Sequence, residues 1–317
     1  MSTYRILITG GSGLLGGRLV QYFSAIDNIE IYLGTSKPLE LPSYVKSGKV
    51  RFLDWDSESS LKSACLDTNV IIHCAGMNAQ DCQKNPERAL EFNGFTTGKL
   101  LDAAIKMNVS RFIYISTAHV YDSPLKGLVT ENSPLLNSHP YATSNVSGEQ
   151  QVNQRYDRIT GINVRLSNAY GAPVSPLVNC WMLLVNDLCK QAVTTNQMVL
   201  KTSGIQIRDF IPISEVCRAI HHLLNLPLNM DEHTFNLGGN MSMSVWDMAL
   251  LIQKRCKEVL GFSPNLQRVS PSTNEVSENF EYDTTKLLST GYKYLNYYQS
   301  EIDQLLYFCN LNFKNVN

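Results

Sequence analysis

Thr-Gly-Gly-Ser-Gly-Leu-Leu-Gly, residues 9–16, stands between an apolar run and a segment with helical periodicity. Gly10 permits a tight turn, and Gly13 lets a phosphate approach the backbone because no Cβ lies in the way. Gly16 allows close packing of the helix on the strand. The N–H groups that begin the helix, with the positive end of its dipole, then face the anion. We therefore predict a dinucleotide phosphate site at Gly10, Gly13, Leu14, Leu15 and Gly16.

Around this turn, the first half of the chain alternates between short apolar runs and longer helical patterns. The predicted strands are Tyr4–Thr9, Ile29–Gly34, Val50–Leu53, Asn69–Cys74, Arg111–Ser116 and Gly161–Leu166. The predicted helices include Gly13–Ser24, Pro86–Met107 and Tyr141–Tyr156. Apolar strands that alternate with helices are typical of a buried parallel sheet. The sequence therefore predicts an α/β fold with a doubly wound parallel sheet of the Rossmann type.

After Tyr170 the pattern becomes less regular. The segments expected there are helices at Leu177–Ala192, Ser214–Leu224 and Ser244–Val259, and strands near Val199, at Ile205–Ile211 and at Thr234–Leu237. We divide the chain into a dinucleotide-binding domain, residues 1–170 with 205–226 added, and a smaller C-terminal α/β substrate lobe, residues 171–317. Ligands of open α/β sheets bind at the carboxyl ends of the strands, so the site is expected between sheet and lobe.

The composition argues against several classes of protein. Hydrophobic residues make up 44% and charged residues 17% of the 317 residues, which indicates a folded globular protein. The formal net charge of -1 gives no general attraction to nucleic acid or to an anionic membrane. The eight cysteines form no Cys-x-x-Cys pair, and we predict no metal site. The N-terminal residues lack a signal-peptide pattern and no long apolar run follows, so we expect a cytoplasmic protein without a membrane span.

The end of the second predicted strand bears on the choice of cofactor. Sites selective for NAD usually place an acidic residue there, which holds the ribose 2′-hydroxyl. This sequence has Gly34 at that point, followed by Ser36 and Lys37. Gly34 leaves room for a 2′-phosphate, which Ser36 and Lys37 would attract. The alternative is an ordinary polar loop with a solvated lysine. We expect NADP or NAD as the cofactor, with NADP preferred.

Over nearly its whole length the chain resembles the extended short-chain dehydrogenase/reductase family, in particular its NAD(P)-dependent sugar-nucleotide epimerases and dehydratases. The glycine turn begins the resemblance, and Ile115–Tyr121 and Val164–Gly171 resemble later motifs in the same order. The resemblance implies that further residues contact or support the dinucleotide: Asp54 with Trp55 beside it, Cys74, Ala75, Gly76 and Asn93. It also implies a sugar nucleotide as substrate and a homodimer formed through helices 86–107 and 141–156.

The resemblance breaks at the residues that would transfer the proton. It implies that Thr117 supplies the catalytic hydroxyl and that Tyr141 is the acid/base of a Tyr-x-x-x-Lys motif. Free tyrosine has a pKa near ~10, which a lysine one helical turn away lowers. This sequence has Asn145 instead, which forms hydrogen bonds but carries no charge. A cation about 4 Å away contributes on the order of 4 kcal/mol at an effective dielectric of ~20, so we expect impaired proton transfer.

Three interpretations of Asn145 remain open. The chain is an enzyme with weak or altered acid–base chemistry, in which another cation replaces the lysine. Alternatively, it binds a dinucleotide without turnover, as a sensor or an assembly subunit. In the third interpretation it is an active enzyme with a different base, for which His119 is the candidate. Strand alternation would put His119 on the same face as Thr117. A half-exposed histidine beside a turn is the plainer interpretation of His119.

The resemblance also assigns residues to the substrate. Asn168 and Arg208 are expected to hold the sugar or the diphosphate, and His119 belongs to the same group. Because Asp209 follows Arg208, a local ion pair is the alternative. The 4,6-dehydratases place an acidic pair after their hydroxyl residue, whereas this chain has Ala118 and His119. We therefore expect an epimerase or reductase acting on a nucleotide-linked sugar rather than a dehydratase.

Overall fold

Seven parallel strands form the central sheet, in the order β11-β7-β5-β4-β1-β2-β3. The computed structural model describes residues 3–273 and 275–314. The strands are β1 (Tyr4–Thr9), β2 (Ile29–Thr35), β3 (Gly48–Phe52), β4 (Val70–His73), β5 (Arg111–Thr117), β7 (Thr160–Leu166) and β11 (Thr234–Leu237). The strand order reverses at β1, which lies between β2 and β4, and ligands bind beside such a reversal. The predicted doubly wound parallel sheet is confirmed.

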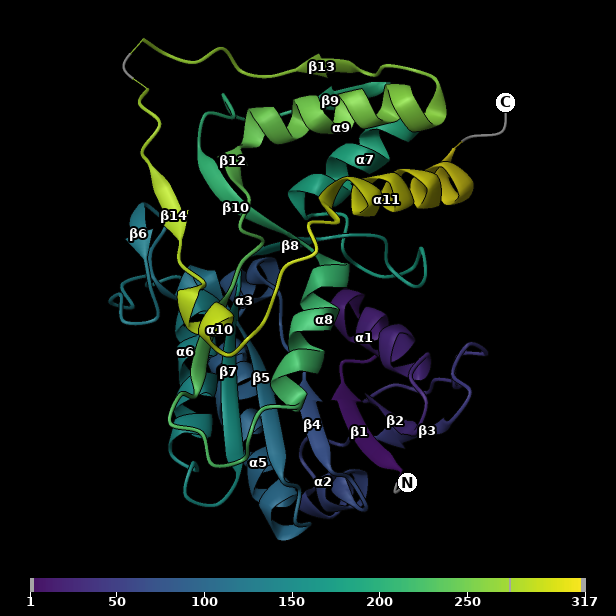
Figure 1. Ribbon diagram of the computed structural model, residues 1–317, viewed down its shortest axis with the longest axis vertical. Helices are drawn as coiled ribbons and strands as arrows, with labels where there is room; N and C mark the ends of the chain where they lie inside the picture. The colour runs from purple at the N-terminus through teal and green to yellow at the C-terminus, as the bar shows by residue number, and fades with distance from the viewer. Residues whose placement is uncertain (1–2, 274, 315–317) are drawn as a thin grey trace.

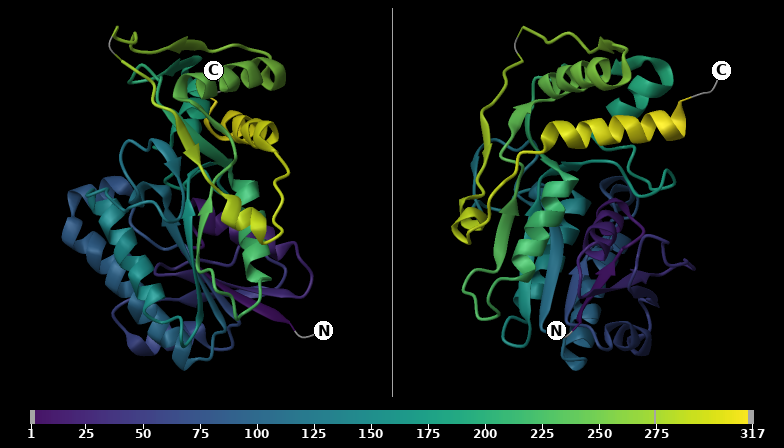
Figure 2. Two further views of the ribbon diagram at one scale, coloured as in Figure 1. Left: turned by 60° about the vertical axis from the view of Figure 1, so that its left-hand side comes forward. Right: turned by 45° about the vertical axis from the view of Figure 1, so that its right-hand side comes forward.

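Helices cover both faces of this sheet (Figures 1 and 2). α1 (Leu14–Ser24) and α8 (Ile213–Leu224) share one core with Ile6 and Ile8. Leu7 points to the opposite face, where a second core is formed with α2 (Glu58–Cys65), α5 (Thr96–Lys106) and α6 (Pro140–Asn153). Successive residues of a strand alternate between faces, and both faces are covered here. This arrangement explains why β1 is apolar without interruption.

A smaller lobe lies beyond the carboxyl ends of the strands, at the top of Figure 1. Its helices α7 (Leu184–Thr195), α9 (Val245–Leu260) and α11 (Tyr298–Phe313) pack around a separate core. Its short strands are β8 (Asn168–Tyr170), β9 (Gln197–Val199), β10 (Ile207–Pro212), β12 (Ser242–Ser244) and β13 (Asn265–Gln267). β10 pairs with β8, which follows β7 after one residue. The lobe is therefore joined to the sheet at the strand ends where a ligand is expected.

Parts of residues 171–317 return to the sheet. β11 is the outer strand of the central sheet, in register with β7 from Thr234 opposite Asn163 to Leu237 opposite Leu166. The short helix α10 (Thr285–Ser289) lies next to it, and its Leu287 belongs to the core of the sheet. The predicted lobe thus supplies one strand and one helix to the larger unit.

Two predicted helices differ from the observed ones. The helix predicted at Leu177–Ala192 begins only at Leu184, and residues 177–183 form turns and bends. The buried Asn186 amide donates to the carbonyl oxygen of Gly171 (2.9 Å) and to the Cys180 sulfur (3.5 Å), which holds the chain before α7 against the helix. The helix predicted at Pro86–Met107 is present as α4 (Pro86–Ala89) and α5, joined by a π-helical stretch at Leu90–Phe95. Such stretches are frequent at functional sites.

Short elements complete the fold. They are α3 (Ala79–Lys84), a 3₁₀ turn at Ala118–Val120, and β6 (Gly127–Val129) paired with β14 (Phe280–Tyr282). The 3₁₀ turn and these two strands enclose a small core of their own between sheet and lobe. Within residues 3–273 and 275–314, none of the helices has the length and apolar character that a membrane crossing requires.

Candidate functional site

A cavity of about 480 Å³ lies between the carboxyl ends of the central strands and the lobe. Its walls come from the start of α1, the loop after β4, the end of β5, the start of α6, and from β8 and β10. Many of the predicted site residues line it together: Leu14, Leu15, Cys74, Ala75, Gly76, Asn93, Thr117, His119, Tyr141, Asn145, Asn168 and Arg208. The structure therefore brings the predicted catalytic and substrate residues to one place.

The glycine turn has the geometry of a phosphate site. Gly10 has a φ of +65°, and a Cβ there would lie 2.9 Å from the backbone nitrogen of Ala75. A Cβ on Gly16 would lie 2.2 Å from the carbonyl oxygen of Gly10, so the predicted close packing of helix on strand requires glycine. No side chain caps the start of α1 at Gly13. The first N–H groups of α1 are left for a ligand, and they suit the diphosphate of a dinucleotide.

The residues predicted at the adenosine end lie outside this cavity. Ser36 and Lys37 are exposed just beyond β2, and the Thr35 hydroxyl bonds to the backbone of Lys37. The Asp54 carboxylate accepts from the backbone N–H of Asp56 (3.1 Å) and is exposed. Trp55 packs edge-on against Phe92, with ring centroids 5.4 Å apart. These residues follow β2 and β3, so they lie at the carboxyl ends of the strands, as the glycine turn does.

Asn93 connects two parts of the cavity wall. It lies in the π-helical stretch, and its side-chain oxygen accepts from the backbone N–H of Met77 (2.8 Å). Its amide nitrogen donates to the Ser144 hydroxyl on α6 (3.0 Å). Asn93 thereby ties the loop after β4 to the helix that carries Tyr141. The contacts support the structural role that the resemblance implies for it.

The Asn145 side chain points into the protein, where both of its polar atoms have hydrogen-bond partners. Its side-chain nitrogen donates to the carbonyl oxygen of Tyr141 (2.7 Å), and its side-chain oxygen accepts from the Tyr114 hydroxyl (3.2 Å). The residue is only 5% exposed, although it borders the cavity. No lysine lines the cavity among the described residues, and the lining cation is Arg208. The position that resembles the family lysine therefore holds a neutral group with internal partners.

Tyr141 and Thr117 meet at the cavity as predicted. The Thr117 hydroxyl is hydrogen-bonded to the Tyr141 phenol, which favours the ionised form of that phenol. Burial is the larger effect and raises the pKa of Tyr141 above its usual 10. The Tyr141 phenol is therefore protonated at neutral pH, which makes it a hydrogen-bond donor rather than a base.

His119 reaches the cavity by a different route from the one predicted. β5 ends at Thr117, and the chain turns into the 3₁₀ turn, so strand alternation does not place His119 beside Thr117. The Thr117 hydroxyl caps this turn by accepting from the His119 backbone N–H (3.2 Å). Desolvation by the surrounding protein lowers the pKa of His119, and Arg208 and His139 lower it further. The imidazole is neutral at pH 7.

Arg208 and Asn168 face the cavity from the lobe strands. Among the described residues, Arg208 forms no ion pair with Asp209 or with any other carboxylate, and its guanidinium donates a long hydrogen bond to the side-chain oxygen of Gln206 (3.5 Å). Burial lowers the pKa of Arg208. Asp209 instead accepts from the backbone N–H of Gly239 (2.8 Å). Asn168 donates to the carbonyl oxygen of Asp209 (2.8 Å), which leaves its side-chain oxygen for a ligand. The unpaired guanidinium suits an anionic ligand.

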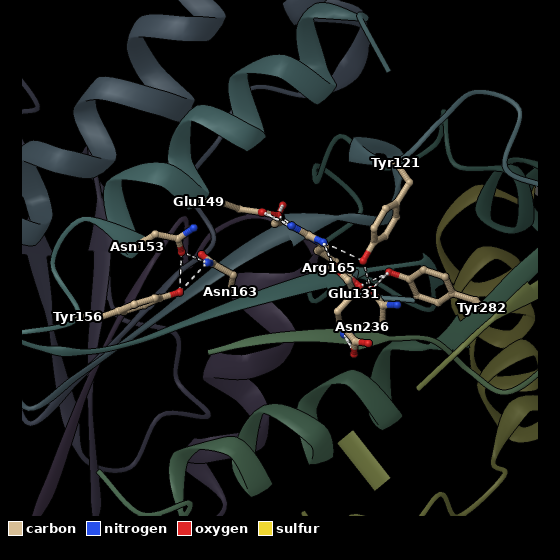
Figure 3. Close-up of polar contacts among 10 residues, drawn as sticks. Tyr121, Glu131, Glu149, Asn153, Tyr156, Asn163, Arg165, Asn236 and Tyr282 are labelled. Atoms are coloured by element: carbon tan, nitrogen blue, oxygen red, sulfur yellow. Dashed lines mark hydrogen bonds and ion pairs between the residues drawn. The ribbon is translucent and has the colours of Figure 1, made fainter. Parts of the chain in front are cut away.

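Beneath the cavity lies a buried polar network (Figure 3). Arg165 of β7 forms an ion pair with Glu149 of α6 (2.7 Å), and Glu149 also accepts from the Ser116 hydroxyl (2.6 Å). Arg165 donates to the Tyr121 hydroxyl (2.9 Å), which donates to Asn236 (2.6 Å). Glu149 lies two helical turns beyond Tyr141, on the same side of α6. The network fixes α6 relative to the strand that ends in Thr117.

Several lining residues were not predicted from the sequence. They are Met77–Gln80, Tyr114, Ser167, Tyr170, Met182–Val185 and Phe210. Tyr114 lies within β5 and bonds to Asn145, and a tyrosine in a strand gives no sign of such a contact. Residues 182–183 were predicted to be helical, yet they lie in the irregular segment before α7. Only their place after β8 hinted that they reach the site.

Comparison with known proteins agrees with this picture. The profile of the NAD dependent epimerase/dehydratase family matches residues 6–238. The human dTDP-D-glucose 4,6-dehydratase is 26% identical over 272 residues, which are 80% of this chain and 74% of that protein.

Solved structures show the same fold. TunA, an NAD dependent NDP-hexosamine 5,6-dehydratase of tunicamycin biosynthesis, superposes with a TM-score of 0.76 at 25% identity, covering 96% of this chain and 97% of that one. The UDP-glucuronic acid 4-epimerase of Bacillus cereus, solved with UDP-glucuronic acid and NAD, has a TM-score of 0.79 at 20% identity, covering 97% and 99%.

Proposed function

This chain belongs to the NAD dependent epimerase/dehydratase family, and we propose that it oxidises or reduces one carbon of a nucleotide-linked sugar. One observation carries the proposal. The glycine turn, the hydrogen-bonded Thr117 and Tyr141, and the unpaired Arg208 all border a single cavity. A bound nicotinamide dinucleotide would supply the hydride acceptor or donor in that cavity.

The residues of the chain then have separate tasks. The start of α1 binds the diphosphate of the dinucleotide through its free N–H groups. Arg208 binds the diphosphate of the sugar nucleotide, and Asn168 offers its side-chain oxygen to a sugar hydroxyl. Thr117 and Tyr141 donate hydrogen bonds to the oxygen of the carbon that changes oxidation state.

Epimerisation or reduction is favoured over dehydration. Loss of water from a sugar requires an acid for the departing hydroxyl. Ala118 follows Thr117 and has no functional group, and none of the described residues that line the cavity carries a carboxyl group. The proposed reaction therefore stops at the exchange of a hydride and a proton.

A second candidate function is a protein that binds the dinucleotide without turnover. The observation that favours it is the state of Asn145, whose two polar atoms have internal partners and which brings no charge to Tyr141. The phosphate site at the glycine turn would be retained in such a protein. The two candidates make different predictions for sugar nucleotides, which only the enzyme would convert.

We extend the proposal to the cofactor as NADP or NAD. The exposed Ser36 and Lys37 offer a hydroxyl and a positive charge to a 2′-phosphate, and no acidic residue stands at the end of β2. Gly34 itself is buried, and a Cβ there would lie 2.7 Å from the Leu53 side chain, so the expected space at Gly34 is taken up by the core. The solved relatives whose bound dinucleotide is named contain NAD, so they lend the preference for NADP no support. The ratio of the two affinities decides between the cofactors.

The experiment is a titration of the purified protein with NADPH and with NADH, followed by nicotinamide fluorescence. We expect both to bind, with NADPH tighter, and substitution Lys37→Ala to weaken only NADPH. The protein with bound oxidised cofactor is then mixed with a panel of UDP- and dTDP-sugars while absorbance at ~340 nm is recorded. A rise in absorbance, or a new sugar nucleotide detected by NMR of the same mixture, supports the enzyme. Binding of the dinucleotide with neither change across the panel supports the second candidate, and equal or tighter binding of NADH overturns the preference for NADP.

A further inference from the structure

The cavity is short of groups that accept a proton at neutral pH. Its lining residues that titrate are Cys74, Tyr114, His119, Tyr141, Tyr170 and Arg208. We propose that His119, and not Tyr141, accepts the proton that the sugar hydroxyl loses, while Thr117 and Tyr141 hold the oxygen by hydrogen bonds. This assignment rests on the proposed function and names a further catalytic residue within it.

The other titratable groups are unsuited to this task. Burial raises the pKa of Tyr141, and Asn145 provides no positive charge to reverse that effect. Burial also raises the pKa values of Cys74, Tyr114 and Tyr170, so all three keep their protons at neutral pH. Arg208 is permanently charged and only donates hydrogen bonds. A proton acceptor in this cavity must therefore come from the imidazole.

His119 is held by its backbone and free at its ring. Its N–H donates to Thr117, and its carbonyl oxygen accepts from the side chain of Asn137 (2.7 Å). Among the described residues, no hydrogen bond ends on a ring nitrogen of His119, and the side chain is exposed to the cavity. His139 differs, because its Nδ1 accepts from the backbone N–H of Tyr141 (3.1 Å) and caps α6. His119 alone of the two has both nitrogens available to a substrate.

The charges around His119 couple its basicity to the substrate. The groups whose charges reach it are Arg208 on β10 and His139 at the start of α6, and both lower its pKa. A diphosphate bound to Arg208 neutralises that cation and adds negative charge nearby, which raises the pKa of His119. His119 is therefore a weak base in the free protein and becomes a stronger one when the sugar nucleotide occupies the cavity.

The step is balanced in atoms and electrons. The O–H bond of the sugar hydroxyl breaks, and its proton joins a ring nitrogen of His119. The C–H bond of the same carbon breaks, and its hydride goes to the oxidised nicotinamide of the proposed cofactor. The carbon–oxygen bond becomes a carbonyl. In the reverse direction the imidazolium returns the proton, as epimerisation requires.

The first test measures the pKa of the His119 imidazole and requires no turnover. The His119 C–H resonances of the ¹³C-labelled protein, assigned with the His119→Gln variant, are followed by NMR from pH 4.5 to 8.5. We expect a midpoint below the ordinary 6.5 in the free protein. Saturating UDP should raise that midpoint, and Arg208→Gln should raise it in the free protein and remove the response. A midpoint above 7 in the free protein, or a midpoint that UDP lowers, overturns the assignment.

The second test uses the hydride signal of whichever sugar nucleotide responds in the panel. His119→Gln should slow the signal by roughly 10²–10⁴-fold, the usual contribution of a general base, and abolish the fall of rate at acidic pH. His139→Asn is the matched control, since asparagine keeps the helix cap and the rate should remain within a few-fold. A normal rate and an unchanged pH profile in His119→Gln would overturn the proposal.

A double variant provides an independent check. Adding Asn145→Lys to His119→Gln lowers the pKa of Tyr141, so that the phenol replaces the imidazole and the rate recovers at least tenfold. No recovery, with dinucleotide binding intact, would mean that His119→Gln had lost something other than a proton acceptor, which would overturn the assignment. If the proposed function itself fails, no sugar nucleotide gives a signal with the wild type. In that case the NMR midpoint still tests whether the pKa of His119 responds to a bound diphosphate.

Discussion

The polar groups of this protein differ sharply between the layer beneath the cavity and the cavity wall. In the layer beneath, the charged Glu149 and Arg165 are buried, yet they bond to each other and to Ser116, Tyr121 and Glu131. On the wall, Arg208 has no carboxylate partner and the His119 ring has no hydrogen bond among the described residues. The buried pair comes from α6 and β7, whereas Arg208 and His119 come from β10 and the 3₁₀ turn.

The difference separates structural from functional polarity. A buried charge whose partners are all internal has nothing left to offer a ligand, and its removal harms the fold. A half-buried charge without a partner costs stability in the free protein and is compensated when a ligand binds. The comparison predicts that substitutions below the cavity reduce stability, and that substitutions on the wall reduce binding or chemistry.

We expect the largest loss of stability when the buried Arg165–Glu149 ion pair is broken. Arg165→Met leaves the Glu149 carboxylate buried without its partner, which should lower the free energy of unfolding by about 3–5 kcal/mol. Arg88→Met is the control, because the Arg88–Glu91 pair is exposed and should contribute less than about 1 kcal/mol. Chemical denaturation measures both variants. Equal losses in the two would mean that the layer beneath the cavity has no special role in stability.

A smaller effect is expected for the unpaired cation of the wall. Arg208→Gln should not lower the free energy of unfolding, since no ion pair is lost and an unpartnered, half-buried charge is removed. It should weaken UDP binding by about 1.5–3 kcal/mol, the usual strength of a charge-assisted hydrogen bond. Calorimetry with UDP checks this, with the dinucleotide affinity as the internal control. Unchanged UDP affinity would remove Arg208 from the substrate site.

The smallest effect concerns a histidine with internal partners. His73 lies 2.6 Å from the Thr9 hydroxyl and 3.2 Å from the Thr97 hydroxyl, and burial lowers its pKa to about 3. Below about pH 6.5 the unfolded chain binds a proton that the folded chain refuses, so stability falls as the pH decreases. At pH 5.5 the loss should be about 1.4 kcal/mol relative to neutral pH.

The measurement for His73 is the free energy of unfolding at pH 5.5 and pH 7.5. His73→Gln keeps a hydrogen-bonding side chain but cannot take up the proton. Its free energy of unfolding should therefore change by about 1.4 kcal/mol less than that of the wild type between these two pH values. Parallel changes in the two proteins would show that His73 does not carry the acid sensitivity.

Much of the fold could be predicted because its signals are local. The glycine turn combines a positive φ at Gly10 with a close approach at Gly16, and only glycine meets both demands. The apolar strands could be recognised because both faces of the sheet are covered. The prediction was wrong for residues 177–183, where tertiary contacts such as that of the Asn186 amide with the Cys180 sulfur (3.5 Å) accompany an irregular backbone despite the helical pattern. Periodicity does not contain that information.

The site could be predicted only in part. Thr117, Tyr141 and Arg208 were placed by resemblance and do border one cavity. Strand alternation does not pair His119 with Thr117 as predicted, because Thr117 ends its strand and caps a 3₁₀ turn. The contact of Asn145 with Tyr114 could not be predicted either, because Tyr114 comes from a strand 31 residues away in sequence.

By itself, the sequence determined the order of strands and helices, the phosphate turn and the absence of a lysine four residues after Tyr141. Each of these depends on the identity of residues close together in the chain. Only the tertiary structure decided which polar groups are paired, because Glu149 and Arg165, or Asn145 and Tyr114, meet across elements. Burial and neighbouring charge follow from that assembly and set proton affinities. The tertiary structure, rather than the motif, leaves His119 and Arg208 free for a ligand.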